Sequence, residues 1–125
     1  MKRILIVDDK IELRKLIRIT LKFKEGYELF EAEDGVSALE MAKIVRPHLV
    51  ILDVMMPGKD GYEVCAELKG NKEYNNPIVI MLTARAQAKD IEKGMQVGAD
   101  NYLTKPFSPM QLLDLLKDSF SEAAA

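Results

Sequence analysis

The chain has 125 residues, of which 48% are hydrophobic and 30% are charged, a composition typical of one folded domain. With 18 Lys and Arg against 20 Asp and Glu, the net charge is −2, which argues against nucleic-acid binding through overall charge. The single cysteine, Cys65, excludes an internal disulfide framework and fits a reducing compartment. The longest unbroken apolar run, residues 78–82, is far too short to cross a membrane, and we see no signal-peptide core. We therefore expect a cytoplasmic location.

Short apolar runs predict the strands in chain order: Ile4–Val7, Tyr27–Phe30, Leu49–Leu52, Ile78–Leu82 and Tyr102–Leu103. The first, third and fourth runs are unbroken, which is typical of strands that are covered on both faces in a parallel sheet. The second run alternates polar and apolar residues, so we expect it at a sheet edge.

Between these runs, apolar residues recur at helical spacing. The predicted core stripes are Leu13, Leu16, Ile17 and Leu21; Val36, Leu39, Ala42 and Val45; Gly61, Val64, Cys65 and Leu68; Ile91 and Met95; and Leu112, Leu113, Leu116 and Phe120. Asp60 and Ser108 are expected to cap the third and fifth helices. Arg14, Lys15 and Arg18 are interpreted as a solvated helix face.

Strand and helix alternate five times, which predicts an α/β domain with a parallel sheet and helices on both of its faces. Right-handed crossovers restrict the topology. The expected strand order is 2-1-3-4-5, the flavodoxin-like arrangement, in which ligands bind at the switch point between the first and third strands.

Polar side chains come at or just after the predicted strand ends. Asp8 and Asp9 follow the first strand, Asp53 the third and Thr83 the fourth, and Lys105 comes shortly after the fifth. Because the carboxyl ends of parallel strands lie at one edge of the sheet, these groups are expected to converge. The three carboxylates would repel one another unless a cation were present.

Carboxylate ligands without His or Cys suit Mg²⁺, and Mn²⁺ is a possible substitute. The Lys105 amine and the Thr83 hydroxyl can bind phosphoryl oxygens. One carboxylate is then free to act as a nucleophile, because the cations offset the repulsion between two anions. The set therefore predicts a site that forms an aspartyl phosphate.

Motifs along nearly the whole chain resemble those of the response-regulator receiver domain of two-component signalling. They are the pair Asp8-Asp9, LVILDVMMPG at residues 49–58, LTA at residues 82–84 and YLTKPF at residues 102–107. The resemblance implies one receiver domain over residues 1–122, with residues 123–125 as a tail.

The resemblance also implies roles at the phosphorylation site. Asp53 would be the phosphoacceptor. Asp9 and Asp53 would bind Mg²⁺ directly, Asp8 would hold a metal-bound water, and Met55 would contribute its backbone carbonyl. Lys10 follows the acidic pair where an acidic or small polar residue is frequent, so we expect a somewhat lower metal affinity.

A second group of residues would respond to the phosphoryl group. Thr83 and Lys105 would contact it, and the small side chain of Ala84 would leave room for it. Tyr102 would be an aromatic switch that turns inward as Thr83 moves. The family implies a cis peptide bond between Lys105 and Pro106.

The partners that the resemblance implies are a histidine kinase or phosphotransfer protein and an output protein that the sequence does not identify. The output surface would comprise the fourth helix, fifth strand and fifth helix. Residues 110–120 lack the arginines typical of receivers that dimerise ahead of a DNA-binding domain. This favours a stand-alone regulator or a module of a larger signalling protein. We expect a monomer or a weak phosphorylation-dependent dimer, without direct nucleic-acid binding or membrane attachment.

Two other functions use similar chemistry or the same fold. A phosphatase with an aspartyl nucleophile would resemble the haloacid-dehalogenase pattern, but that pattern has a second Asp where this chain has Met55. A flavin-binding module would need a phosphate loop rich in Gly, Ser or Thr after the first strand, where Asp8, Asp9 and Lys10 stand. We expect self-phosphorylation and slow self-dephosphorylation, and no enzymatic turnover of a free substrate.

Overall fold

The computed structural model describes residues 1–22, 24–84 and 87–124, with side chains described through residue 121. The described residues form a five-stranded sheet of β1 (Lys2–Val7), β2 (Tyr27–Ala32), β3 (Leu49–Asp53), β4 (Ile78–Thr83) and β5 (Asn101–Thr104). All neighbouring strands are parallel, in the order β2-β1-β3-β4-β5. This confirms the predicted order and places β2 at an edge.

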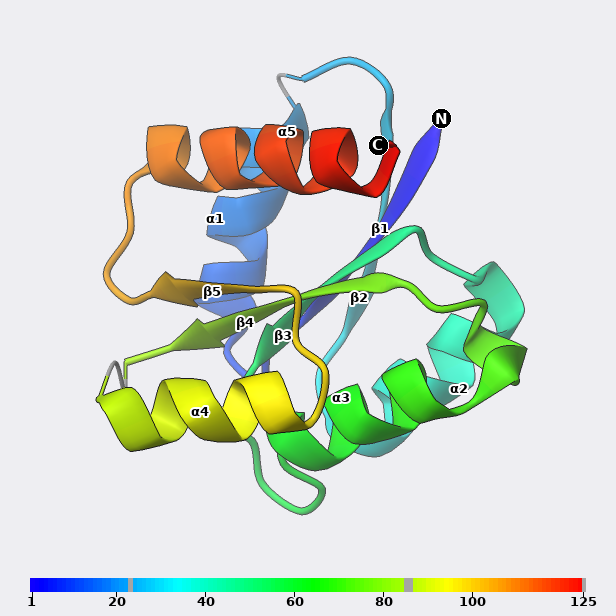
Figure 1. Ribbon diagram of the computed structural model, residues 1–125. Helices are drawn as coiled ribbons and strands as arrows, with labels where there is room; N and C mark the ends of the chain where they lie inside the picture. The colour runs from blue at the N-terminus through cyan, green and yellow to red at the C-terminus, as the bar shows by residue number, and fades with distance from the viewer. Residues whose placement is uncertain (23, 85–86, 125) are drawn as a thin grey trace.

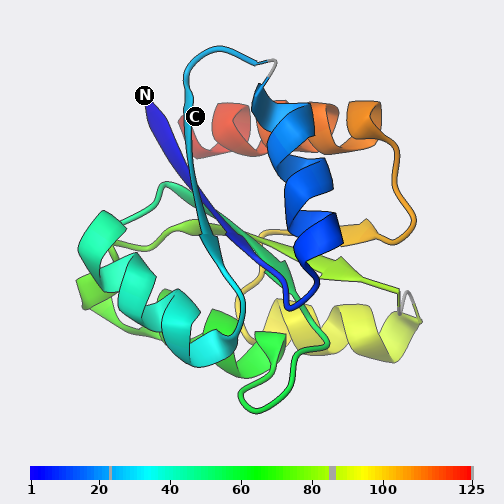
Figure 2. The ribbon, with the colours of Figure 1, turned by 180° about the vertical axis from the view of Figure 1, so that it is seen from behind.

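Helices cover both faces of the sheet (Figures 1 and 2). α1 (Ile11–Lys22) and α5 (Pro109–Ala124) lie on one face, and α2 (Gly35–Val45), α3 (Gly61–Gly70) and α4 (Ala88–Gln96) lie on the other. A short 3₁₀ helix, η1 (Lys72–Tyr74), precedes β4. The result is the three-layer α/β architecture that the alternating pattern predicted.

Each central strand contributes to two apolar cores because successive side chains point to opposite faces of the sheet. Leu5 and Leu52 belong to the core beneath α2 and α3, whereas Ile4 and Ile51 belong to the core beneath α1 and α5. All four side chains are fully buried. The unbroken apolar runs of β1 and β3 thus reflect burial on both faces.

Four residues predicted to lie in the core are exposed: Leu16, Val36, Ile91 and Met95. In α1, Thr20 is buried together with Ile17 and Leu21, whereas Leu16 is not. The hydroxyl of Thr20 donates to the carbonyl of Leu16 at 2.8 Å, so its hydrogen bond is made within the helix. In α4 the buried residue is Gly94, which packs against the ring of Tyr102. The stripe prediction was wrong here because small and polar side chains can face the sheet when their polar groups are paired.

The predicted helix caps are confirmed. The Asp60 carboxylate accepts from the backbone N–H of Glu63 at 2.9 Å, and the Ser108 hydroxyl accepts from that of Gln111 at 3.1 Å. Helix α5 continues through Ala124 and residue 125 lies outside the described residues, so the domain boundary at residue 122 stays a prediction. Within the described part of the chain, we find no helix with the length and apolar character needed to cross a membrane.

Candidate phosphoacceptor and metal site

Three carboxylates meet at the carboxyl edge of the sheet. Asp8 and Asp9 directly follow β1, and Asp53 is the last residue of β3. One carboxylate oxygen from each residue lies within 4.8 Å of the others. Asp8 is fully buried and Asp53 is 3% exposed, whereas Asp9 faces solvent. The predicted convergence of these three side chains is therefore observed.

The ammonium group of Lys105 lies between two of these carboxylates. Its Nζ is 3.2 Å from Asp8 Oδ2 and 3.2 Å from Asp53 Oδ1. The backbone N–H of Lys105 donates to the carbonyl of Thr83 at 2.8 Å, which fixes the start of this loop to the end of β4. The peptide bond between Lys105 and Pro106 is cis, as the resemblance implied.

Backbone N–H groups hold the buried carboxylates in position. Asp8 Oδ1 accepts from the backbone N–H of Lys10 at 2.9 Å, and Asp53 Oδ1 accepts from that of Met55 at 3.3 Å. The side chain of Met55 is 52% exposed, so this residue faces the site with its backbone. Its predicted contribution of a carbonyl to a metal stays a prediction.

Sequence reasoning missed the role of Arg14 at this site. Its Nη1 donates to the backbone carbonyl of Asp8 at 2.6 Å, and its Nε donates to Glu31 of β2 at 3.1 Å. The side chain is 12% exposed, so the interpretation of Arg14 as solvated was wrong, whereas Arg18 at 47% exposed fits it. The sequence contained one indication that Arg14 is not fully solvated: it directly follows Leu13 and so lies at the border of the apolar stripe.

Helix α3 begins directly against the backbone of Asp53. A Cβ atom on Gly61 would overlap the carbonyl oxygen of Asp53 and the Cα of Val54. The backbone N–H of Gly61 donates to the carbonyl of Val54 at 3.0 Å. The absence of a side chain at Gly61 therefore allows the contact that fixes the end of β3 to the first turn of α3.

The electrostatic environment disfavours a free negative charge on Asp53. Burial, and then the charge of Asp8, raise the pKa of Asp53, while Lys105 and the N–H of Met55 lower it. One ammonium group thus offsets the three carboxylates only in part. A further cation at this edge would stabilise the ionised cluster.

The donor set fits a hard divalent cation. Three carboxylates within 4.8 Å of one another supply oxygen ligands. Mg²⁺ favours such ligands and keeps several waters of its own, which an exposed group such as Asp9 leaves room for. The structure therefore supports the predicted magnesium site on the chemistry of its side chains.

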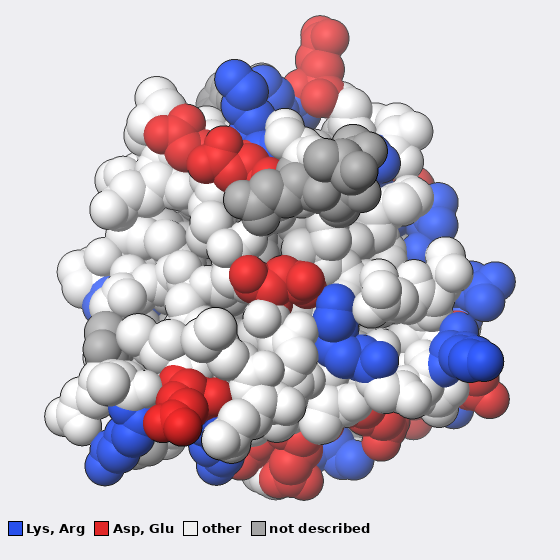
Figure 3. All heavy atoms as spheres, in the orientation of Figure 1, with Lys and Arg blue, Asp and Glu red and all other residues white. Residues whose placement is uncertain are grey.

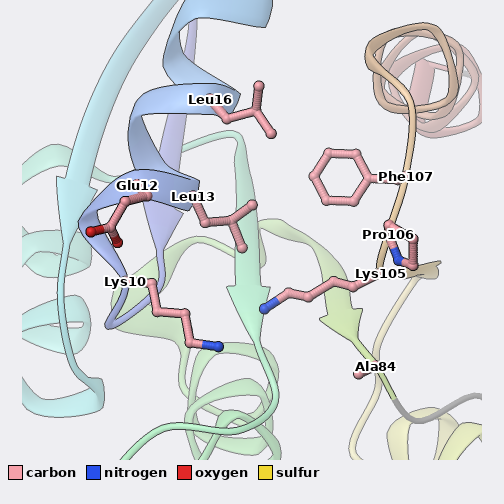
Figure 4. Close-up of a pocket in the computed structure, with 8 residues that line it drawn as sticks. All are labelled: Lys10, Glu12, Leu13, Leu16, Ala84, Lys105, Pro106 and Phe107. Atoms are coloured by element: carbon pink, nitrogen blue, oxygen red, sulfur yellow. The ribbon is translucent and has the colours of Figure 1, made fainter.

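A cavity of about 550 Å³ opens beside Lys105 (Figure 4). Leu13 and Leu16 of α1 line one side of it, and Pro106 and Phe107 line the other. The side chains of Lys10 and Lys105 both reach toward the opening, and Ala84 lies at its lower rim in this view. Thr83, which precedes Ala84, is 1% exposed at the end of β4.

Tyr102 of β5 is held at the junction of α3 and α4. Its hydroxyl donates to the backbone carbonyl of Asp90 at 2.8 Å and contacts the hydroxyl of Tyr62 at 3.4 Å. Burial raises the pKa of Tyr102, and the bond to Tyr62 adds to this effect. The ring is partly buried, and its predicted role as a switch stays a prediction.

Comparisons with known proteins agree with this fold and site. A family model of the response regulator receiver domain matches residues 4–117. The chain is 49% identical over 111 residues to a curated Cyanophora paradoxa protein named "Probable transcriptional regulator ycf27", a match over 89% of this chain and 45% of that protein. The chain thus belongs to the response regulator receiver domain family, and it spans about half the length of this relative.

Two solved structures, from proteins of different kinds, are also similar to this chain. Vibrio cholerae chemotaxis protein CheY4 is 35% identical with a TM-score of 0.89, over 95% of this chain and 98% of that one. The signal receiver domain of a Syntrophus aciditrophicus signal transduction histidine kinase is 32% identical with a TM-score of 0.88, over 98% of this chain and 92% of that one. Similar domains thus occur in proteins of different kinds.

Proposed function

We propose that this receiver domain is a switch in which Asp53 accepts a phosphoryl group from a histidine kinase or phosphotransfer protein. The observation that carries the proposal is the pairing of a nearly buried Asp53 with Lys105 inside the carboxylate cluster. Asp53 lies beside two other acids and has a raised pKa. A carboxylate with a purely structural role requires neither feature, whereas both are common at functional sites.

The chain's own residues suit the transfer step. An Asp53 carboxylate oxygen would attack the phosphorus, the P–N bond of the donor phosphohistidine would break, and the leaving imidazole would take up a proton from water. The Lys105 ammonium group would exchange its carboxylate partner for a phosphoryl oxygen, and the Thr83 hydroxyl would donate to another. Mg²⁺, or Mn²⁺ in its place, held by Asp8, Asp9, Asp53 and the carbonyl of Met55, would supply the remaining positive charge.

We infer that the donor approaches Asp53 through the cavity beside Lys105, because Lys105 lines this cavity and pairs with Asp53. Its sides are apolar, which suits an uncharged imidazole ring, and the ammonium groups of Lys10 and Lys105 attract an anionic phosphoryl group. In this proposal Lys10 helps to attract the phosphoryl group, a role that is separate from metal binding. We infer that a protein donor approaches over α1 and the loop after β5.

Transfer would change the charge at the sheet edge and thereby shift an equilibrium between two conformations. We infer that α4, β5 and α5 carry the response to an output protein. Figure 3 shows acidic and basic side chains interspersed with broad uncharged areas on the face that carries these elements. Such a surface suits a protein partner. We expect the domain to act as a monomer or weak dimer and to turn over no free substrate.

Intact-mass spectrometry tests the proposal directly. The protein is incubated with acetyl phosphate and Mg²⁺, and we expect a mass increase of one phosphoryl group that requires the metal. Asp53→Asn should show no increase, whereas Asp60→Asn, which keeps a favourable helix cap, should match the wild type. An unchanged wild-type mass, or an increase that survives in Asp53→Asn, would contradict the proposal.

A further inference from the structure

The side chain of His48 connects the start of β1 to the chain that enters β3. Its ring atom Nδ1 accepts from the backbone N–H of Arg3 at 2.9 Å, and the backbone N–H of His48 donates to the carbonyl of Arg3 at 2.9 Å. Regular pairing of the two strands begins one residue later, between Ile4 and Leu49. The imidazole therefore extends the sheet by one position, with a side-chain nitrogen as the acceptor in place of a carbonyl.

The same two residues fix the end of α2 and the start of β4. The Arg3 guanidinium donates from Nε to the carbonyl of Val45 and from Nη2 to that of Arg46, both at 2.8 Å. These carbonyls lie at the carboxyl end of α2, where the helix itself supplies no donors. The carbonyl of His48 accepts from the backbone N–H of Ile78 at 3.0 Å. Four elements thus meet at the amino edge of the sheet, opposite the carboxylate cluster.

This geometry requires a neutral imidazole with its proton on Nε2. Nδ1 can accept from the Arg3 N–H only if it carries no proton of its own. A proton on Nδ1 would set two donors against each other and leave the Arg3 N–H without its acceptor, which is unfavourable for a partly buried group. Protonation of His48 and its contact with β1 therefore exclude each other.

The surroundings of the ring oppose its protonation as well. Burial, and then the positive charges of Arg3, Lys2 and the N-terminal amine, lower the pKa of His48. Arg46, on the loop before β3, is a further cation, and no acidic group is among the described groups that act on the ring. The ring and Lys2 border a cleft of about 220 Å³, which admits solvent and whose other lining residues are uncharged: Pro47, Asn75, Asn76, Ile78 and Phe120.

We propose that His48 is a pH-sensitive connection between β1, β3 and α2, closed while its imidazole is neutral and opened when the ring is protonated in mild acid. Opening frees the Arg3 N–H, weakens the hold of Arg3 on the end of α2, and loosens the start of the strand that ends at Asp53. The device uses none of the groups at the carboxylate edge, so it does not depend on the proposed function.

The direction of the pH effect follows from proton binding. Because the folded protein binds a proton at His48 more weakly than the unfolded chain does, the stability that this contact contributes is complete above the ordinary pKa of 6.5. It is lost as the pH falls from that value through the lowered pKa of the folded protein.

The state of the ring can be observed directly, because the chain has one histidine. In isotope-labelled protein at alkaline pH, we expect the nitrogen resonances of a neutral ring with its proton on Nε2. On acidification the folded protein should titrate with a midpoint below 6.5, and the urea-unfolded chain with a midpoint close to it. A proton on Nδ1, or a folded midpoint at or above that of the unfolded chain, would overturn the proposal.

Hydrogen exchange of the Arg3 amide tests whether protonation opens the contact. The matched variant is His48→Asn, whose Oδ1 stands as far along the side chain as Nδ1 and accepts the same bond without titrating. Below the ordinary His pKa we expect wild-type protection of this amide to fall by up to about tenfold per pH unit until the lowered pKa is reached. Protection in His48→Asn should change little, and His48→Ala should leave the amide poorly protected throughout. Constant wild-type protection, or an equal loss in His48→Asn, would overturn the proposal.

Discussion

Lys105 and Asp53 form an ion pair of 3.2 Å although they are 52 residues apart in the sequence. The same ammonium group lies 3.2 Å from Asp8, so one cation is shared by two buried carboxylates. Asp9 adds a third negative charge within 4.8 Å. The cluster therefore keeps an excess of negative charge, and this excess determines how the site responds to substitution, pH and metal.

Removal of the Lys105 ammonium should make the protein more dependent on a divalent cation. In Lys105→Ala, Asp8 and Asp53 lose their shared partner, so we expect the free energy of unfolding in EDTA to fall by about 1–3 kcal/mol. Mg²⁺ should restore more stability to this variant than to the wild type. Thermal unfolding with and without Mg²⁺ measures both effects, and Lys117→Ala, an exposed lysine of α5, is the control. Equal Mg²⁺ responses in the two variants would contradict this.

Asp53 should reduce stability at neutral pH in the absence of metal. Because burial raises the pKa of Asp53 in the folded protein, the folded state binds this proton more tightly than the unfolded chain does. Stability is therefore lost as the pH rises from the ordinary Asp value of 3.8 through the raised pKa. We expect Asp53→Asn to melt a few degrees above the wild type at pH 7 in EDTA, with a smaller difference near pH 3. A gain that is equal at both pH values would be inconsistent with this cause.

The contact between Gly61 and the Asp53 backbone should not tolerate a side chain. In Gly61→Ala the new Cβ meets backbone atoms of Asp53 and Val54, which cannot move aside as the end of a flexible side chain can, so we expect a loss of about 1–3 kcal/mol of stability. Asp53 would also be displaced, and uptake of the phosphoryl group should slow. Denaturant unfolding and intact-mass time courses measure these effects against Gly70→Ala, where an added Cβ meets no atom within 4 Å. Wild-type values for Gly61→Ala would show that the end of β3 can shift freely.

Arg14 and Arg18 form a matched pair because both contact Glu31. Arg14 also donates to the carbonyl of Asp8 and is 12% exposed, whereas Arg18 is 47% exposed. We expect Arg14→Ala to lower stability by about 1–2 kcal/mol and to weaken Mg²⁺ binding, because the turn that carries Asp8 loses its anchor. Arg18→Ala should cost less than about 0.5 kcal/mol and leave the metal affinity unchanged. Calorimetry of unfolding and of Mg²⁺ binding compares the two, and equal effects would argue against an anchoring role.

The carboxylate cluster could be predicted because it depends on patterns along single strands, whereas the strand order was taken from the known flavodoxin-like arrangement. Unbroken apolar runs identify doubly covered strands, and in a parallel sheet the residues at their carboxyl ends must share one edge. Asp53 and Thr83 proved to be the last residues of their strands rather than the residues after them. This difference of one position does not affect their convergence.

Contacts between different helices could not be predicted in the same way. Periodicity shows which face of a helix is apolar, but not which neighbour covers that face or how closely. Gly94 was missed because it matters through the space that it leaves for the Tyr102 ring. Ile91 and Met95 were predicted to be buried but are exposed, because α4 packs against the sheet at Gly94. Arg14 was misjudged because its partners are a carbonyl and a glutamate on other elements.

The groups at the carboxylate edge come from the loop after β1, the ends of β3 and β4 and the loop after β5, and Lys105 is the last of them along the chain. A nascent or proteolysed chain that ends before β5 still contains Asp53, but it has neither the shared cation nor the tyrosine seated on α4. Under the proposed function, such a fragment would lack the residues that respond to a phosphoryl group on Asp53. Phosphorylation and response would then become coupled only once the final strand and the loop after it are in place.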